Sequence, residues 1–119
     1  MTKSRQHTGQ LGEQLASELL EQKGHRILER NFRCRLGEID IITQIEEYLV
    51  FCEVKTRTGK NSIHPTASIT AKKIKKLRQL GLLYIQQKQY YHLQPRFDVI
   101  AVQLTRNGSP MVEHFINAL

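Results

Sequence analysis

Residues 38–55 read Glu-Ile-Asp-Ile-Ile-Thr-Gln-Ile-Glu-Glu-Tyr-Leu-Val-Phe-Cys-Glu-Val-Lys. Apolar, aromatic and β-branched residues cluster or alternate from Glu38 to Ile45 and again from Tyr48 to Thr56, a pattern typical of half-buried strands. The two residues between them, 46 and 47, are predicted to form a tight turn, although Glu-Glu is an unusual pair for one. The sequence therefore predicts a β-hairpin.

Two carboxylates of this hairpin are predicted to oppose each other. With the turn at residues 46–47, counting back along both strands places Asp40 opposite Glu53 and Glu38 opposite Lys55. Directly opposed residues have Cβ atoms about 5 Å apart. The two carboxylates therefore repel each other unless a cation lies between them or one of them binds a proton.

A divalent cation is one solution to this repulsion. Mg²⁺ binds through one or two carboxylates together with waters and substrate phosphates, and Asp40 and Glu53 can supply those carboxylates. Lys55 would then lie beside the ion. The alternative is a solvated sheet face with a Glu38–Lys55 ion pair and no metal, and a register slip of one residue would turn one strand's charges to the opposite face.

Composition indicates one domain with an anionic partner. The chain has 119 residues, of which 39% are hydrophobic, and this length is enough for a single core. Its net charge of +7 favours nucleic acid as a partner, although solubility alone also explains such a charge. Two cysteines, a polar start and the lack of a long apolar run predict a cytoplasmic domain that makes no membrane contact.

A first helix is predicted from Thr8 or Gly9 to Lys23, ending at Gly24. Its buried stripe consists of leucines and one alanine at helical spacing, namely Leu11, Leu15, Ala16, Leu19 and Leu20. Two glutamates lie at the borders of this stripe, Glu13 at one and Glu18 at the other. Geometry alone does not decide which of them faces inward.

A second helix is predicted from Ser68 or Thr70 to about Gln87, with Thr70 as a cap. Its first half is the most basic part of the chain, with Lys72, Lys73, Lys75, Lys76 and Arg78. This concentration of charge favours contacts with phosphates, whereas an even spread around the helix would indicate a solvated surface. The segment from Thr56 to Pro65 before it has little apolar content and is predicted to be a mobile loop that could cover a substrate.

Three further strands are predicted, at His25–Arg33, Arg96–Leu104 and Met111–Ala118, with Asn107-Gly108 as a hairpin turn between the last two. Asp98 lies inside a strand and needs a partner, either a basic neighbour or the site itself. Three arginines precede Gly37, namely Arg30, Arg33 and Arg35, and they suit either phosphates or the nearby acids. The chain has no zinc-ligand spacing, phosphate-binding glycine loop or nucleophile elbow, which leaves metal-assisted hydrolysis among the enzyme classes.

These residues resemble a known family. Asp40 followed by Glu53-Val54-Lys55 resembles the D…(D/E)-x-K signature of the restriction-endonuclease-like nuclease superfamily. More narrowly, the chain resembles the uncharacterised bacterial family UPF0102, typified by YraN and thought to be distantly related to archaeal Holliday-junction resolvases. The matching runs follow in order along nearly the whole chain, at residues 9–16, 31–40, 50–57, 70 with 73, 96–99 and 113–118.

The resemblance implies an α/β fold over residues 1–119, a restriction-endonuclease-like mixed β-sheet flanked by α-helices. It also implies that Asp40, Glu53 and the Val54 carbonyl hold one Mg²⁺ or Mn²⁺ ion, and that Glu13 points toward the site and helps to hold a second. The metal activates a water for attack on phosphate, and Lys55 orients that water or stabilises the transition state. Contacts with the nucleic-acid backbone are expected from basic side chains near the site, namely Arg33, Arg35, Arg57, Lys72, Lys73 and Lys76.

The leading hypothesis is a metal-dependent endonuclease that acts on DNA, with branched or damaged DNA among the candidate substrates. The main rival is a nucleic-acid-binding module that keeps the nuclease fold without turnover. A third hypothesis is an interaction protein whose acidic hairpin meets a basic partner. Related resolvases work as dimers, so a homodimer is compatible with the resemblance, but no self-complementary surface can be identified from the residues.

Overall fold

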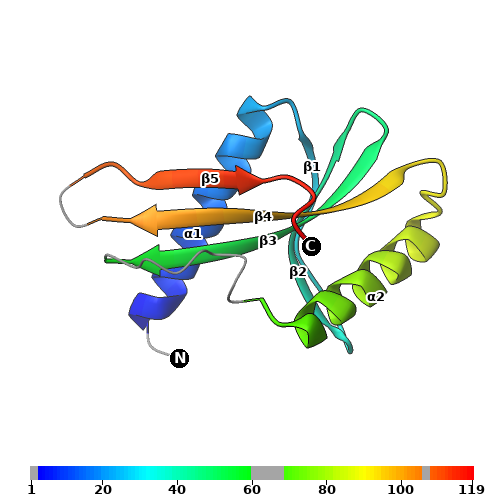
Figure 1. The fold of residues 1–119 in the computed structure, drawn as a ribbon, viewed down its shortest axis with the longest axis horizontal. Helices are drawn as coiled ribbons and strands as arrows, with labels where there is room; N and C mark the ends of the chain where they lie inside the picture. The colour runs from blue at the N-terminus through cyan, green and yellow to red at the C-terminus, as the bar shows by residue number, and fades with distance from the viewer. Residues whose placement is uncertain (1–2, 60–68, 106–107) are drawn as a thin grey trace.

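The computed structural model describes residues 3–59, 69–105 and 108–119, with side chains from residue 7 onward. Its elements in chain order are α1 (Lys3–Gln22), β1 (Arg26–Cys34), β2 (Gly37–Ile45), β3 (Tyr48–Thr58), α2 (Ala71–Lys88), β4 (Gln94–Leu104) and β5 (Met111–Phe115). The strands form one sheet in the order β1-β2-β3-β4-β5, in which β3 and β4 are parallel and the other neighbours antiparallel (Figure 1). The predicted α/β fold, a mixed sheet flanked by helices, is confirmed.

The predicted hairpin forms between β2 and β3. Ile45 pairs with Tyr48, and the ladder runs back in register to Ile41 opposite Cys52. Glu46 adopts a left-handed conformation with φ of 52°, which lets two residues without glycine complete the turn. The register expected from the sequence is therefore confirmed over this part of the hairpin.

The second strand of the hairpin is longer than predicted. Residues 56–58, which were expected to begin a loop, continue β3 because they pair with residues 102–104 of β4. The rest of the expected loop up to Pro65 includes residues 60–65, which lie outside the described residues. Ser68, the alternative start considered for the second helix, also lies outside them.

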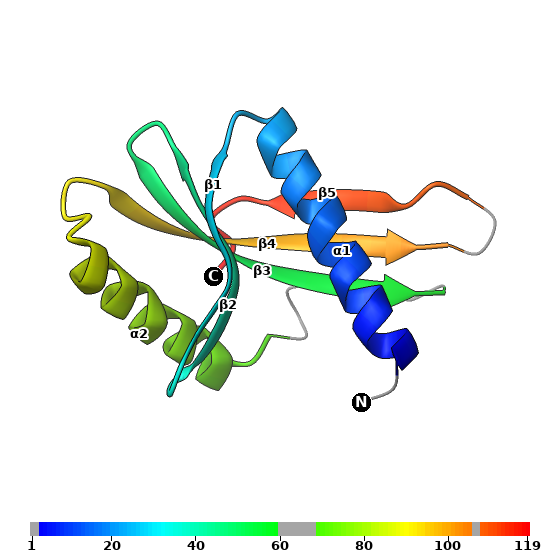
Figure 2. The ribbon, with the colours of Figure 1, turned by 180° about the vertical axis from the view of Figure 1, so that it is seen from behind.

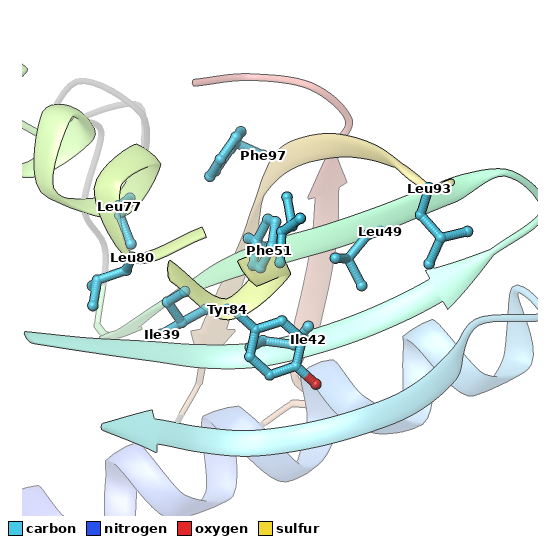
Figure 3. Close-up of a cluster of buried hydrophobic side chains, with 10 residues drawn as sticks. Ile39, Ile42, Leu49, Phe51, Leu77, Leu80, Tyr84, Leu93 and Phe97 are labelled. Atoms are coloured by element: carbon cyan, nitrogen blue, oxygen red, sulfur yellow. The ribbon is translucent and has the colours of Figure 1, made fainter. Parts of the chain in front are cut away.

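The two helices cover opposite faces of the sheet (Figures 1 and 2). Figure 3 shows the cluster on the α2 side, which consists mainly of Ile39, Ile42, Leu49, Phe51, Leu77, Leu80, Tyr84 and Phe97. The cluster on the α1 side consists of Ala16, Leu20, Ile41, Val50, Cys52, Ile100 and Val102. Because successive residues of β3 point to alternate faces, this central strand contributes to both clusters and is buried on both sides.

The helices start and end for local reasons. α1 begins at Lys3, so the predicted start at Thr8 or Gly9 was wrong; the preceding Lys, Arg and Gln residues have good helix propensity and simply extend it. It ends before Gly24, which has φ of 94°. In α2 the Thr70 hydroxyl accepts a hydrogen bond of 3.1 Å from the Lys73 amide, which confirms Thr70 as the cap.

The C-terminal strand is shorter than predicted, because β5 ends at Phe115 rather than Ala118. Two residues later the chain turns at Asn117, with φ of 52°, and the Asn117 amide donates to Oδ1 of Asp98 at 2.8 Å. β4 and β5 are antiparallel as expected, while Asn107 of the predicted turn lies outside the described residues. No helix of the described part of the chain is long and apolar enough to cross a membrane.

Asp98 is fully buried and satisfied by basic neighbours. Arg96 donates to both of its carboxylate oxygens, at 3.1 and 2.9 Å, and Nε2 of His114 lies 2.7 Å from Oδ2. Burial opposes ionisation of Asp98, but the hydrogen bonds from His114 and Arg96 outweigh it and hold the pKa of Asp98 below its usual value. The Nδ1 atom of His114 lies 2.6 Å from Nζ of Lys23, so this network joins β4 and β5 to the end of α1.

Candidate metal centre

Three carboxylates from one helix and one strand lie close together. Glu13 of α1 and the β2 residues Glu38 and Asp40 each place a carboxylate oxygen within 4.8 Å of the others. Within the described ranges this is the one group of three or more potential ligands close enough to share a metal ion. Glu53, expected to be a ligand together with Asp40, lies outside this group.

Asp40 occupies the point where β2 and β3 separate. The last backbone pair between the two strands is Ile41 with Cys52. Beyond it the Val54 amide donates a hydrogen bond of 2.7 Å to the side-chain oxygen Oδ2 of Asp40 rather than to a backbone carbonyl of β2. Burial, followed by the nearby charge of Glu53, raises the pKa of Asp40 to about 7, even though the bond from Val54 acts in the opposite direction. Asp40 therefore takes up its proton at a pH closer to neutral than an ordinary aspartate does, in the metal-free protein.

Glu53 is buried and paired with two lysines. Its Oε1 atom lies 2.7 Å from Nζ of Lys73 and 3.7 Å from Nζ of Lys55. Burial and the neighbouring Lys73 lower the pKa of Lys55. Burial acts in the same direction on Lys73, but its hydrogen bond and charge interaction with Glu53 raise the pKa of Lys73 overall.

Glu38 has a different partner from the one considered for it in the sequence. It lies opposite Arg33 of β1, and Oε1 of Glu38 is 3.5 Å from Nε of Arg33. A Glu38–Lys55 ion pair does not form among the described residues, since Lys55 pairs with Glu53 instead. The Glu38–Lys55 pair of the alternative hypothesis is therefore not found in the described part of the chain.

Glu13 reaches the acidic group because α1 lies very close to β3. Residue 12 is a glycine whose missing side chain leaves room for Thr56 of β3. Glu18 is instead exposed and accepts a hydrogen bond of 3.2 Å from Gln14 on the same helix. The structure thus places Glu13, and not Glu18, beside Asp40.

The residues predicted to contact nucleic acid differ in their exposure. Lys72 and Lys76 are exposed on α2, and Arg35 is exposed after β1, whereas Lys73 turns inward to Glu53. Arg57 follows Lys55 by two residues along β3, and its Nε atom is buried with no hydrogen-bond partner in residues 3–59, 69–105 and 108–119.

Two residues of the centre were not assigned to it from the sequence. Glu38 was treated only as a partner for Lys55, although its position two residues before Asp40 on one strand was a usable signal. Lys73 was assigned to nucleic acid alone, and its contact with Glu53 depends on how α2 packs against the sheet.

The comparisons with known proteins agree on one family. The model of the uncharacterised protein family UPF0102 matches residues 12–102. The chain is 44% identical over 119 residues to a UPF0102 protein of Pelotomaculum thermopropionicum, covering 99% of both chains. It is 41% identical over 114 residues to one of Pelobacter propionicus, covering 94% of this chain and 81% of the relative. These matches span nearly the whole molecule, and the chain therefore belongs to the uncharacterised protein family UPF0102.

Proposed function

We propose that this protein is a metal-dependent endonuclease that hydrolyses phosphodiester bonds of DNA. The observation that carries the proposal is the convergence of Glu13, Glu38 and Asp40 next to the Glu53–Lys55 pair. The order of Asp40, Glu53 and Lys55 also resembles the signature of restriction-endonuclease-like nucleases. Branched or damaged DNA is the substrate class favoured by the resemblance to junction resolvases.

The acidic group suits a hard divalent cation. Three carboxylates within 4.8 Å offer the oxygen ligands that Mg²⁺ and Mn²⁺ prefer. Among the described residues, the one ion pair that any of them makes is the 3.5 Å contact of Glu38 with Arg33. Burial, followed by the charge of Glu53, raises the pKa of Asp40, and a cation bound beside Asp40 would favour its ionised form. Asp40, Glu13 and Glu53 would hold the ion together with the Val54 carbonyl, and Glu38 is a further donor.

The residues of the centre would have separate roles in hydrolysis. When bound, a divalent ion polarises the scissile phosphate and lowers the pKa of a coordinated water. The Lys55 ammonium group, held beside Glu53, would stabilise negative charge that develops on the phosphate. The Val54 amide fixes the orientation of Asp40 through its hydrogen bond.

Binding of DNA would come from the basic residues around the centre. The exposed Lys72 and Lys76 are one helical turn apart on α2, so they can contact successive phosphates of one strand. Arg57 and Arg35 would extend this surface on the strand side. Such contacts release counterions, and the affinity should fall steeply as salt increases.

The decisive experiment is a cleavage assay with linear, nicked and four-way DNA in Mg²⁺ or Mn²⁺. We expect wild type to cut at least one of these substrates, with cleavage reduced at least about a hundredfold in Asp40→Asn and Lys55→Ala. Lys75→Ala on the exposed side of α2 is the control, because it removes one positive charge outside the metal centre. Wild type that binds DNA without cutting it would favour the rival function of a binding module.

A further inference from the structure

The Glu53 carboxylate forms ion pairs with two lysine side chains. Both Lys55 and Lys73 approach the same oxygen, Oε1, and the shorter contact of 2.7 Å belongs to Lys73. The Glu53 side chain is 7% exposed, while that of Lys73 is 43% exposed. Lys73 therefore links a buried carboxylate to the solvent.

The backbone of Lys73 is held in place at the start of α2. Its amide is bound by the Thr70 cap, so the first turn of α2 is anchored at this residue. The neighbouring Lys72, Lys75 and Lys76 are exposed, whereas Lys73 is half-buried and turned to the sheet. The lysine that contacts Glu53 is thus held in place by its backbone and movable at its ammonium group.

A metal ion and Lys73 would compete for Glu53. Both are cations, and a divalent ion held by Asp40 and Glu53 would repel an ammonium group 2.7 Å from the same carboxylate. The displaced ammonium group, on a side chain that is already 43% exposed, could then pair with a phosphate oxygen of an incoming substrate. The charge that Lys73 now uses to neutralise Glu53 would become available for the substrate.

We propose that Lys73 is an exchangeable counter-ion, which pairs with Glu53 in the metal-free protein and with the substrate phosphate once a divalent cation is bound. This inference rests on the proposed function, because it takes Glu53 to be a metal ligand. It couples the two binding events: the metal frees Lys73 for DNA, and DNA draws Lys73 away from the metal ligand. Each partner should therefore raise the affinity of the other by the same factor.

The test measures Mn²⁺ binding without DNA by electron paramagnetic resonance, and binding of a non-cleaved DNA by fluorescence anisotropy with and without Ca²⁺. We expect Lys73→Gln to bind Mn²⁺ roughly three- to tenfold more tightly than wild type, because its competitor for Glu53 is gone. The same variant should lose most of the Ca²⁺-dependent gain in DNA affinity. Lys75→Gln, with an identical charge change at an exposed residue two positions away, should keep both wild-type Mn²⁺ affinity and the Ca²⁺-dependent gain.

Lys73→Arg keeps the positive charge and should bind Mn²⁺ like wild type, and circular dichroism melting checks that each variant is folded. Unchanged or weaker Mn²⁺ binding by folded Lys73→Gln would overturn the inference and leave Lys73 as a structural partner of Glu53. The proposed function would stand in that case. If wild type itself fails to bind Mn²⁺, the proposed metal centre is wrong and this inference falls with it.

Discussion

Gly12 of α1 lies against Thr56 of β3 so closely that a β-carbon at residue 12 would overlap with the Thr56 side chain. Gly12→Ala would push α1 away from the sheet, and Glu13 would move with it. We expect a loss of about 1–3 kcal/mol in the free energy of unfolding. We also expect weaker Mn²⁺ binding, because Glu13 would leave the acidic group. Chemical unfolding and Mn²⁺ titration measure the two effects.

The matched control is Gly9→Ala in the same helix. A β-carbon there would meet no atom within 4 Å, so the change should raise stability by up to about 1 kcal/mol through helix propensity alone. Thr56→Ala added to Gly12→Ala should recover part of the loss. Equal stability changes at residues 9 and 12 would show that the close approach of α1 is not what constrains Gly12.

Asp40 should make the metal-free protein less stable as pH rises. Its pKa is about 7 in the folded state against 3.8 for the ordinary side chain, so the folded state binds more protons between these values. The free energy of unfolding should then fall between about pH 4 and pH 7, by roughly 2–4 kcal/mol from this residue. Urea unfolding in the presence of EDTA at several pH values measures this dependence.

Asp40→Asn serves as the reference for that pH series. His25 contributes with the opposite sign, since burial, followed by the charge of His114, lowers its pKa to about 4 and stability from this residue rises as pH increases to about 6.5. The difference between wild type and Asp40→Asn removes this contribution. A difference that stays constant from pH 4 to pH 8 would contradict the raised pKa of Asp40.

The turn between β2 and β3 leaves room for a stabilising change. Glu46 has φ of 52°, a conformation that costs an ordinary residue about 1–2 kcal/mol and that asparagine tolerates better. Glu46→Asn should raise the free energy of unfolding by about 0.5–1 kcal/mol. Thermal melting measures it, with Glu47→Asn as the control because the neighbouring residue does not have a positive φ. The same gain from both variants would mean that removal of charge, and not the backbone, is responsible.

Asp98 should matter for stability and not for the metal centre. All of its contacts come from donors, namely Arg96, His114 and the Asn117 amide, so Asp98→Asn would place an NH₂ group against them. We expect a loss of about 3–5 kcal/mol, because the largely buried guanidinium group of Arg96 loses its counter-charge. Exposed Glu113→Gln should change stability by less than about 0.5 kcal/mol.

The two roles are separated by measuring Mn²⁺ affinity of Asp98→Asn at a temperature where it is folded. Wild-type affinity is expected, since Asp98 is not a member of the acidic group. A large loss of affinity would indicate that this network supports the centre after all.

The local features of this fold were predictable from sequence. The turn at residues 46–47 fixed the pairing of Ile45 with Tyr48, and Gly24 and Thr70 marked helix boundaries through well-understood backbone preferences. The register then followed by counting. These are short-range effects, which depend on neighbouring residues alone.

Contacts between distant segments were not predictable in the same way. The Lys73–Glu53 pair requires α2 to lie on the sheet at a set distance, where Gly81 packs with its α-carbon close to the ring of Phe97. The pairing of Glu38 with Arg33 depends on an irregular β1 register, which shifts between Ile27 and Glu29. No pattern along the chain reports either arrangement, because each is set by packing against another element.

The centre combines residues from the central strand of the sheet with residues from the two helices that pack on it. Glu53 and Lys55 lie on β3, which pairs on one side with β2 up to Cys52 and on the other with β4 throughout, so their backbone should exchange its amide protons slowly. Glu13 and Lys73 are brought in by helices, each resting on the sheet through a different surface. Small shifts of either helix could retune metal choice or substrate range while the strand-borne pair stays fixed, which gives relatives of this protein a route to diverge without rebuilding the sheet.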